Sequence, residues 1–169
     1  MTTDQTGYAL TRDEGTPMWF LGAAPARIKA TGDQTGGAYA LFDFVVPPGS
    51  GRRSGALPLH VHRDEDETVY VLEGAVTVFC GEERFAAKPG TFVFLPRGVP
   101  HGYRSDGADP ARVLEFTVPS GLEGLIAELS VPATDLAGPP PLDAQPALVE
   151  ELIPVAARYG LEIVGPLPT

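Results

Sequence analysis

Short apolar runs, each bounded by Gly, Pro or Asp, recur along the chain up to residue 118. They are rich in Val, Phe, Tyr and Thr, residue types that favour extended strands. The runs are MWFLG (18–22), ARIKA (26–30), YALFDFVV (39–46), TVYVLEG (68–74), AVTVFC (75–80), TFVFLP (91–96) and RVLEFTV (112–118). Many short strands with regular turn signals predict an all-β sandwich or barrel whose strands are mostly antiparallel.

The pattern changes after Pro119, where apolar residues take a helical spacing. Residues 120–130 carry it at Leu122, Leu125, Ile126 and Leu129. Ser120 and Glu123 have the spacing of a capping box at the start of this helix. A second helix is predicted from about Pro146 to Tyr159. We therefore expect residues 1–119 to form the barrel with its N-terminal strands, and residues 120–169 to be a helical extension of the same domain. The helices are expected to pack outside the barrel or on a partner subunit, with a lid over the site as the alternative.

The charge of the chain argues against nucleic-acid and anionic-membrane partners. The net charge is −10, and the one pair of adjacent basic residues, Arg52 and Arg53, lies in a Gly-rich stretch. Nucleic-acid binding normally needs a basic patch that neutralises phosphates. No apolar stretch approaches the roughly 18 residues of a membrane span. The absence of a signal-peptide pattern at the N-terminus and the single Cys80 favour a cytoplasmic protein.

Two of the three histidines in the sequence stand one residue apart and are followed by acidic residues. In a strand, His60 and His62 point to the same face, where two imidazoles form half of a site for a first-row metal. One carboxylate from residues 64–67 can complete a set of two His and one acid across the turn, but the alternation of the strand does not select which. His101 follows a run ended by a Pro/Gly turn, which would place it at the start of the next strand.

At these positions the chain resembles a single-domain cupin. The first cupin motif is roughly G-x5-HxH-x3,4-E-x6-G, and its matches here are His60, His62, Glu67 and Gly74. Ser54 stands where the leading Gly is expected. The second motif is roughly G-x5-P-x-G-x2-H-x3-N, and its matches are Gly90, Pro96, Gly98 and His101. Ser105 replaces the final Asn. The resemblance implies a double-stranded β-helix, that is, a jelly-roll barrel, over roughly residues 15 to 120.

The resemblance also selects Glu67 as the ligating acid and leaves residues 64–66 in the turn. It implies one divalent transition metal per chain, held by His60, His62, Glu67 and His101. These ligand types suit Fe, Mn, Ni, Co, Cu or Zn. Four protein ligands leave open positions on a five- or six-coordinate metal, which is the mark of a catalytic site.

The chain is further similar to the small bacterial cupins of the quercetin-dioxygenase type. This implies a dioxygenase that acts on a flavonol-like or other hydroxylated aromatic molecule, with Glu67 as both ligand and general base. Two alternatives remain open. One is a non-oxidative metal-dependent cyclase or isomerase of a polyketide-like compound, and the other is a cupin that binds a small ligand without turnover. The ligand set does not separate them, because function depends on the site rather than on the fold.

A substrate pocket in such a barrel should be apolar and aromatic. Tyr103 lies two residues after His101 and is expected to share its interior face. Candidate walls of the pocket are Phe44, Phe92, Phe94 and Phe116. The resemblance also favours a homodimer, with the apolar segment TPMWFLG (16–22) as a candidate part of the interface.

Overall fold

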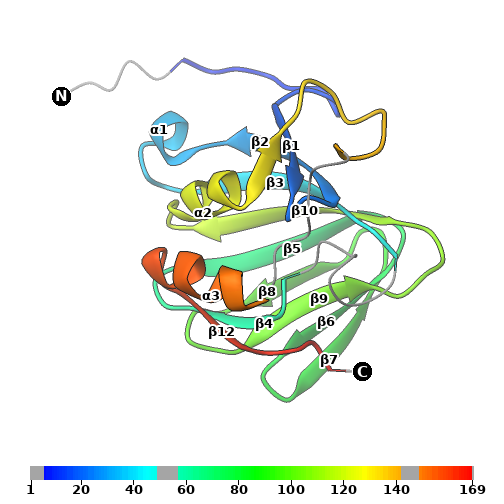
Figure 1. The fold of residues 1–169 in the computed structure, drawn as a ribbon, viewed down its shortest axis with the longest axis vertical. Helices are drawn as coiled ribbons and strands as arrows, with labels where there is room; N and C mark the ends of the chain where they lie inside the picture. The colour runs from blue at the N-terminus through cyan, green and yellow to red at the C-terminus, as the bar shows by residue number, and fades with distance from the viewer. Residues whose placement is uncertain (1–5, 49–56, 142–148, 169) are drawn as a thin grey trace.

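The computed structural model describes residues 6–48, 57–141 and 149–168, which form two antiparallel sheets facing each other (Figure 1). The first sheet has the strand order β11 (Ser130–Pro132), β1 (Thr16–Phe20), β2 (Ala24–Ala30), β3 (Ala40–Val46), β10 (Ala111–Val118), β5 (Asp66–Glu73) and β8 (Phe92–Leu95). The second has the order β12 (Leu161–Gly165), β4 (Leu59–His62), β9 (His101–Ser105), β6 (Val76–Cys80) and β7 (Glu83–Ala87). The predicted all-β jelly-roll fold is confirmed.

Alternation along the strands builds the core between the two sheets. On β5, Val69 and Val71 are completely buried, while Tyr70 between them is exposed. On β8, Val93 and Leu95 point inward in the same way. Successive side chains of a strand point to opposite faces, so each strand contributes every second residue to the core. The strands that will carry the site are therefore anchored by apolar neighbours on the same face.

The C-terminal segment contributes more than the two predicted helices. Helix α2 (Leu122–Glu128) and helix α3 (Val149–Arg158) are present, but strand β11 also joins β1, and strand β12 joins β4. The helical spacing gave no indication of these two short strands. The predicted capping box is wrong, because the N-cap residue Gly121 makes no side-chain cap hydrogen bond. Instead, the Glu123 carboxylate accepts from the backbone N–H of Gly121 and, at 2.7 Å, from that of Gly32 in α1 (Gly32–Thr35).

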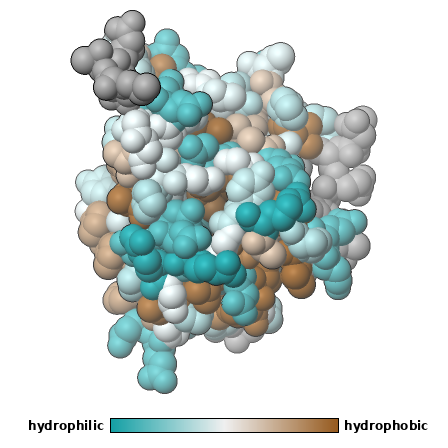
Figure 2. Space-filling model, turned by 90° about the vertical axis from the view of Figure 1, so that its left-hand side faces the viewer, coloured by the Kyte–Doolittle hydropathy of each residue, from teal (hydrophilic) through white to brown (hydrophobic). Residues whose placement is uncertain are grey.

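Helix α3 is amphipathic and lies, with α1 and α2, on one side of the molecule (Figure 1). It buries Leu152 and Ala156, and Gly160 follows it with a φ of 72° that suits a helix C-terminus. Figure 2 looks onto this side, where hydrophilic residues spread across the middle of the face. The predicted start of this helix at Pro146 lies outside the described residues. Over the part of the chain that is described, no helix has the length and apolarity needed to cross a membrane.

Strand β1 packs inside the chain rather than at a free edge. It lies between β11 and β2, and Met18, Trp19 and Phe20 are all buried. These three side chains are already covered within one chain, so they offer no exposed apolar surface, and the homodimer with TPMWFLG at its interface stays a prediction.

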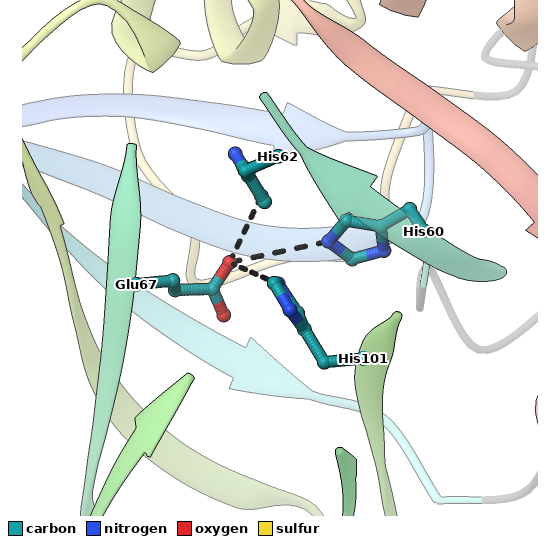
Figure 3. Close-up of side chains that lie close together, drawn as sticks. All are labelled: His60, His62, Glu67 and His101. Carbon is teal, nitrogen blue, oxygen red and sulfur yellow. Dashed lines mark ion pairs between the residues drawn. The ribbon is translucent and has the colours of Figure 1, made fainter. Parts of the chain in front are cut away.

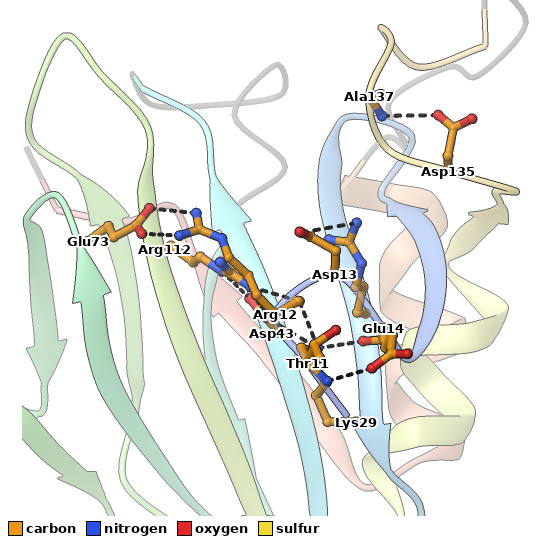
Figure 4. Close-up of polar contacts among 11 residues, drawn as sticks. Thr11, Arg12, Asp13, Glu14, Lys29, Asp43, Glu73, Arg112, Asp135 and Ala137 are labelled. Carbon is orange, nitrogen blue, oxygen red and sulfur yellow. Dashed lines mark hydrogen bonds and ion pairs between the residues drawn. The ribbon is translucent and has the colours of Figure 1, made fainter. Parts of the chain in front are cut away.

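A buried ion pair and a lysine fasten the N-terminal segment to the outer face of the first sheet (Figure 4). Arg112 on β10 donates two hydrogen bonds to the carboxylate of Asp43 on β3, at 2.8 and 2.5 Å. The Lys29 ammonium donates to the backbone carbonyls of Thr11 and Arg12, both at 2.9 Å. These contacts compensate the buried charges on this face and tie the segment before β1 to the barrel.

Candidate metal centre

Three neighbouring parts of the barrel bring the candidate ligands together. His60 and His62 project from one face of β4, and His101 on β9 is the direct cross-strand partner of His60. Glu67 comes from β5 in the opposite sheet. The turn before β9 is fixed to the site, since the N–H of Gly98 donates to the backbone carbonyl of His62 at 2.8 Å. The predicted placement of His101 at the start of a strand is confirmed.

The four side chains converge on one point (Figure 3). Their candidate ligand atoms all lie within 4.8 Å of one another, and all four residues are buried. From Oε2 of Glu67, Nε2 of His62 lies at 3.2 Å, that of His101 at 3.5 Å and that of His60 at 3.9 Å. This arrangement brings together the four residues that the cupin motifs selected.

Backbone carbonyls fix the orientation of two of the imidazoles. Nδ1 of His60 lies 2.8 Å from the carbonyl oxygen of Pro58, and Nδ1 of His101 lies 2.9 Å from that of Val99. A carbonyl oxygen only accepts, so each Nδ1 carries the proton and each Nε2 presents a lone pair to the centre. This is the usual way in which a protein orients a histidine that binds a metal.

Several buried polar atoms at the centre lack a hydrogen-bond partner among the described residues. Three of them face the space between the ligands, namely Nε2 of His60, Nε2 of His101 and Oε1 of Glu67, and two more, Nδ1 of His62 and Oε2 of Glu65, lie beside it. Leaving such atoms unpaired costs free energy unless something occupies the space between them. Nitrogen and carboxylate donors on a closed, buried centre are the ligands of a divalent transition metal, so the residues present fit that group.

Glu65 is a feature of the site that the sequence did not reveal. The resemblance placed it in the turn, yet Glu65 is only 5% exposed and its Oε2 lies 3.6 Å from Nδ1 of His62. The sequence signal that could have indicated this contact is that Glu65 lies three residues after His62. Asp64 is exposed, and Asp66 accepts from the guanidinium of Arg97 at 2.9 and 3.0 Å. Of the four acids, Glu67 therefore faces the centre, and Glu65 lies behind His62 with its carboxylate close to Nδ1.

The electrostatics of the centre follow from burial and from the two acids. Burial raises the pKa of the Glu67 carboxyl, but the three histidines outweigh it and hold that pKa well below its usual range. Burial lowers the pKa of His62, yet the carboxylates of Glu65 and Glu67 outweigh it and raise the pKa to about 10. Burial lowers the pKa of His60. Glu67 is thus ionised at neutral pH, and a metal cation that binds here displaces a proton from His62.

A cavity of about 30 Å³ adjoins the centre, which is room for one or two water molecules. Tyr103 and Phe44 line it, in agreement with their predicted positions. The proposed walls Phe92 and Phe94 are wrong, because they point outward from β8 and are 61% and 51% exposed. Phe116 also does not line the cavity, and its ring packs against the exposed Tyr39. The sequence missed Glu115, Leu122 and Ile126, all of which line the cavity.

Comparison with known proteins agrees with this geometry. Residues 43–117 match the cupin domain family. This stretch is a cupin domain. The chain is 31% identical over 133 residues to a quercetin 2,3-dioxygenase of Bacillus subtilis, a match that covers 79% of this chain and 37% of that protein. It is 30% identical over 80 residues to the uncharacterized protein MJ1618 of Methanocaldococcus jannaschii, which covers 47% of this chain and 60% of that protein.

Among solved structures, this cupin resembles KdgF from Halomonas sp., with a TM-score of 0.57. The identity is 20%, and the match covers 68% of this chain and 94% of that one. At this identity the likeness extends to the fold alone. The chain also spans well under two thirds of the Bacillus protein's length, so the activity of that whole protein is not established for this cupin by the match.

Proposed function

We propose that this cupin is a metal-dependent dioxygenase acting on a hydroxylated aromatic small molecule. The observation that carries the proposal is the convergence of three imidazoles and the Glu67 carboxylate at one buried point beside an apolar cavity. The relative from Bacillus subtilis supports the type of reaction, because its name describes a dioxygenase of an aromatic compound. The relevant metals are the first-row divalent ions that accept imidazole and carboxylate together.

A divalent metal held by His60, His62, Glu67 and His101 would act as a Lewis acid on a substrate oxygen and offer open coordination positions. The chain's own residues then account for the remaining requirements. Oε2 of Glu67 faces the three histidines, while Oε1 has no hydrogen-bond partner among the described residues. Oε1 is therefore the atom placed to accept the proton of a substrate hydroxyl.

The cavity walls favour a compact substrate. Pockets for drug-sized ligands have volumes of roughly 300–1,000 Å³, far more than the space beside the centre. A flavonol could enter only if wall residues moved, and Leu122 and Ile126 of helix α2 are among those walls. A single hydroxylated ring requires a smaller displacement. The proposal therefore favours one-ring phenolic compounds over flavonols.

Elemental analysis and oxygen uptake test this proposal. We expect about one Fe, Mn, Ni, Co or Cu ion per chain, and consumption of dioxygen with a hydroxylated aromatic substrate. The matched control is Asp66→Ala, which changes a neighbouring acid that pairs with Arg97 and should leave both measurements unchanged. Conversion without dioxygen would instead indicate a cyclase or isomerase, and binding without conversion a non-catalytic cupin. No metal after reconstitution would refute the proposal.

A further inference from the structure

A second carboxyl group lies in the cavity beside the candidate metal ligands. Glu115 is on β10 and is 6% exposed, with its side chain on the inner face of the first sheet. The hydroxyl of Tyr103, on β9 of the opposite sheet, donates to Oε2 of Glu115 at 2.6 Å. This hydrogen bond crosses the barrel interior, and both residues line the cavity that also includes His60, His62 and Glu67.

Glu115 and Asp43 are buried acids on the neighbouring strands β10 and β3, but their surroundings differ. Asp43 on β3 is neutralised by two hydrogen bonds from Arg112. Within the described residues, no Lys or Arg forms an ion pair with Glu115. The titratable groups that face it are Tyr103, Glu67 and His62. A buried acid without an ion-pair partner of its own costs free energy, and such costs are concentrated at functional sites.

The Glu115 carboxyl can bond a substrate oxygen group in either protonation state. A carboxylate accepts hydrogen bonds, and a protonated carboxyl both donates and accepts. In the metal-free protein, burial and the nearby Glu67 carboxylate raise the pKa of Glu115 to about 8. The other cavity walls near it, such as Phe20, Phe44 and Leu122, are apolar. Glu115 and Tyr103 are thus the polar groups of the cavity lining that are not candidate metal ligands.

We propose that Glu115, held in place by Tyr103, hydrogen-bonds an oxygen of the substrate while a different substrate oxygen sits at the metal-ligand cluster. The site then selects compact molecules with two oxygen substituents, such as benzenediols, over those with one. This inference rests on the proposed function, because it requires a metal at the cluster. Glu115 is a substrate-binding residue in this role, and Tyr103 is a positioning residue.

Ligand binding to the cobalt-loaded protein tests the inference without relying on turnover. Phenol, catechol and resorcinol are titrated separately, and the visible absorption of Co²⁺ reports binding. We expect the better of the two diols to bind about tenfold more tightly than phenol, as one additional buried hydrogen bond would allow. In Glu115→Met, of similar length, that ratio should fall below about threefold while the Kd of phenol stays unchanged. Glu115→Gln, which keeps a donor and an acceptor, should retain most of the preference.

Tyr103→Phe provides an independent variant if Glu115→Met does not fold, and its preference for the diol should fall at least threefold. The matched control is Phe94→Ala, on the exposed face of β8, which should behave as the wild type. If a folded, cobalt-loaded Glu115→Met keeps the wild-type preference for the diol, the inference is overturned while the proposed metal site stands. If Glu115→Met does not fold, an unchanged preference in Tyr103→Phe has the same meaning. Equal affinity of the wild type for phenol and both diols would do the same. A wild type that binds no Co²⁺ would overturn the proposed metal site, and this inference with it.

Discussion

His60 and His101 lie directly opposite each other on β4 and β9, with ring centroids 4.8 Å apart and their planes inclined at 69°. Nδ1 of each ring contacts the backbone carbonyl of the residue two positions earlier in the sequence. The pair therefore owes its geometry to strand register and turns rather than to other side chains. For this reason the ligand positions should tolerate removal of a single imidazole.

The first prediction follows from this independence of the ligands. His62→Ala or His101→Ala should remove most of the bound metal while the barrel stays folded, because Val69, Val71 and the other core residues are untouched. Metal per chain by mass spectrometry and the far-ultraviolet circular dichroism spectrum provide the two readouts. Stoichiometric metal in both variants would show that the site has been misassigned.

Glu67→Gln separates the two roles proposed for this residue. The amide keeps a carbonyl oxygen for the metal but no longer accepts a proton from the substrate. We expect turnover to fall by about 10²-fold or more, the usual contribution of a general base, with a smaller loss of metal affinity. Metal titration and steady-state rates provide the comparison. A wild-type rate in a metal-loaded Glu67→Gln would exclude the role as base.

Glu65→Gln should weaken metal binding although Glu65 is not a ligand. Its carboxylate lies behind His62, and loss of such a support typically costs 10–100-fold in metal affinity. Competition with a chelator of known affinity measures the effect. Asp64→Asn, an exposed neighbour, is the control and should match the wild type. Equal affinities for all three proteins would mean that Glu65 does not support the ligand.

Arg112→Met should destabilise the fold by up to about 3–5 kcal/mol, because the buried Asp43 carboxylate loses two hydrogen bonds and keeps only its 3.8 Å ion pair with Lys29. Arg12→Met provides the contrast. Arg12 pairs with Glu73 at 2.5 Å, but both side chains are more than half exposed, and such pairs contribute little to stability because water screens their charges. Urea unfolding of the two variants and the wild type compares them. Similar losses in both variants would contradict the structural distinction between the two ion pairs.

The raised pKa of Glu115 predicts how stability depends on pH in the metal-free protein. An unfolded Glu titrates near pH 4.3, whereas folded Glu115 has a pKa of about 8. The folded state therefore binds more protons between these values, and stability falls as pH rises through that window. Glu115→Gln lacks this titration, so its stability should decline less between pH 5 and 8. Parallel pH profiles for the two proteins would refute the assignment.

The clustering of the three histidines could be predicted from local spacing, whereas the choice of Glu67 among the neighbouring acids depended on the resemblance to cupins. The HxH spacing places His60 and His62 on one face of a strand, and the Pro-x-Gly turn places His101 at the next strand's start. Strand alternation also placed Tyr103 correctly. Strand alternation could not show which face of β8 points inward, however. Phe92 and Phe94 on one face are as apolar as Val93 and Leu95 on the other.

The groups that the sequence did not reveal depend on contacts between distant segments. Glu115 reads as one polar residue in an apolar strand, and its partner Tyr103 lies on the other sheet. Glu123 fitted the local pattern of a capping box, yet it also binds the backbone of Gly32, far earlier in the chain. Strand β12 was overlooked because five residues after a helix give little periodicity to read. In each case the role of the residue or strand depends on a contact with a distant segment, and such contacts leave no regular spacing in the sequence.

Strand β12 connects residues 161–165 to the candidate metal centre. It pairs with β4, registering Ile163 against His60 and Leu161 against His62, so the histidine strand has neighbours on both sides. While the chain is being synthesised, β4 lacks this neighbour until residues 161–165 have left the ribosome. The histidine strand should therefore be completed only after residues 161–165 have been synthesised, about 100 residues after the histidines that it carries. A proteolytic cut between β4 and β12 would remove this neighbour unless the two strands stayed paired.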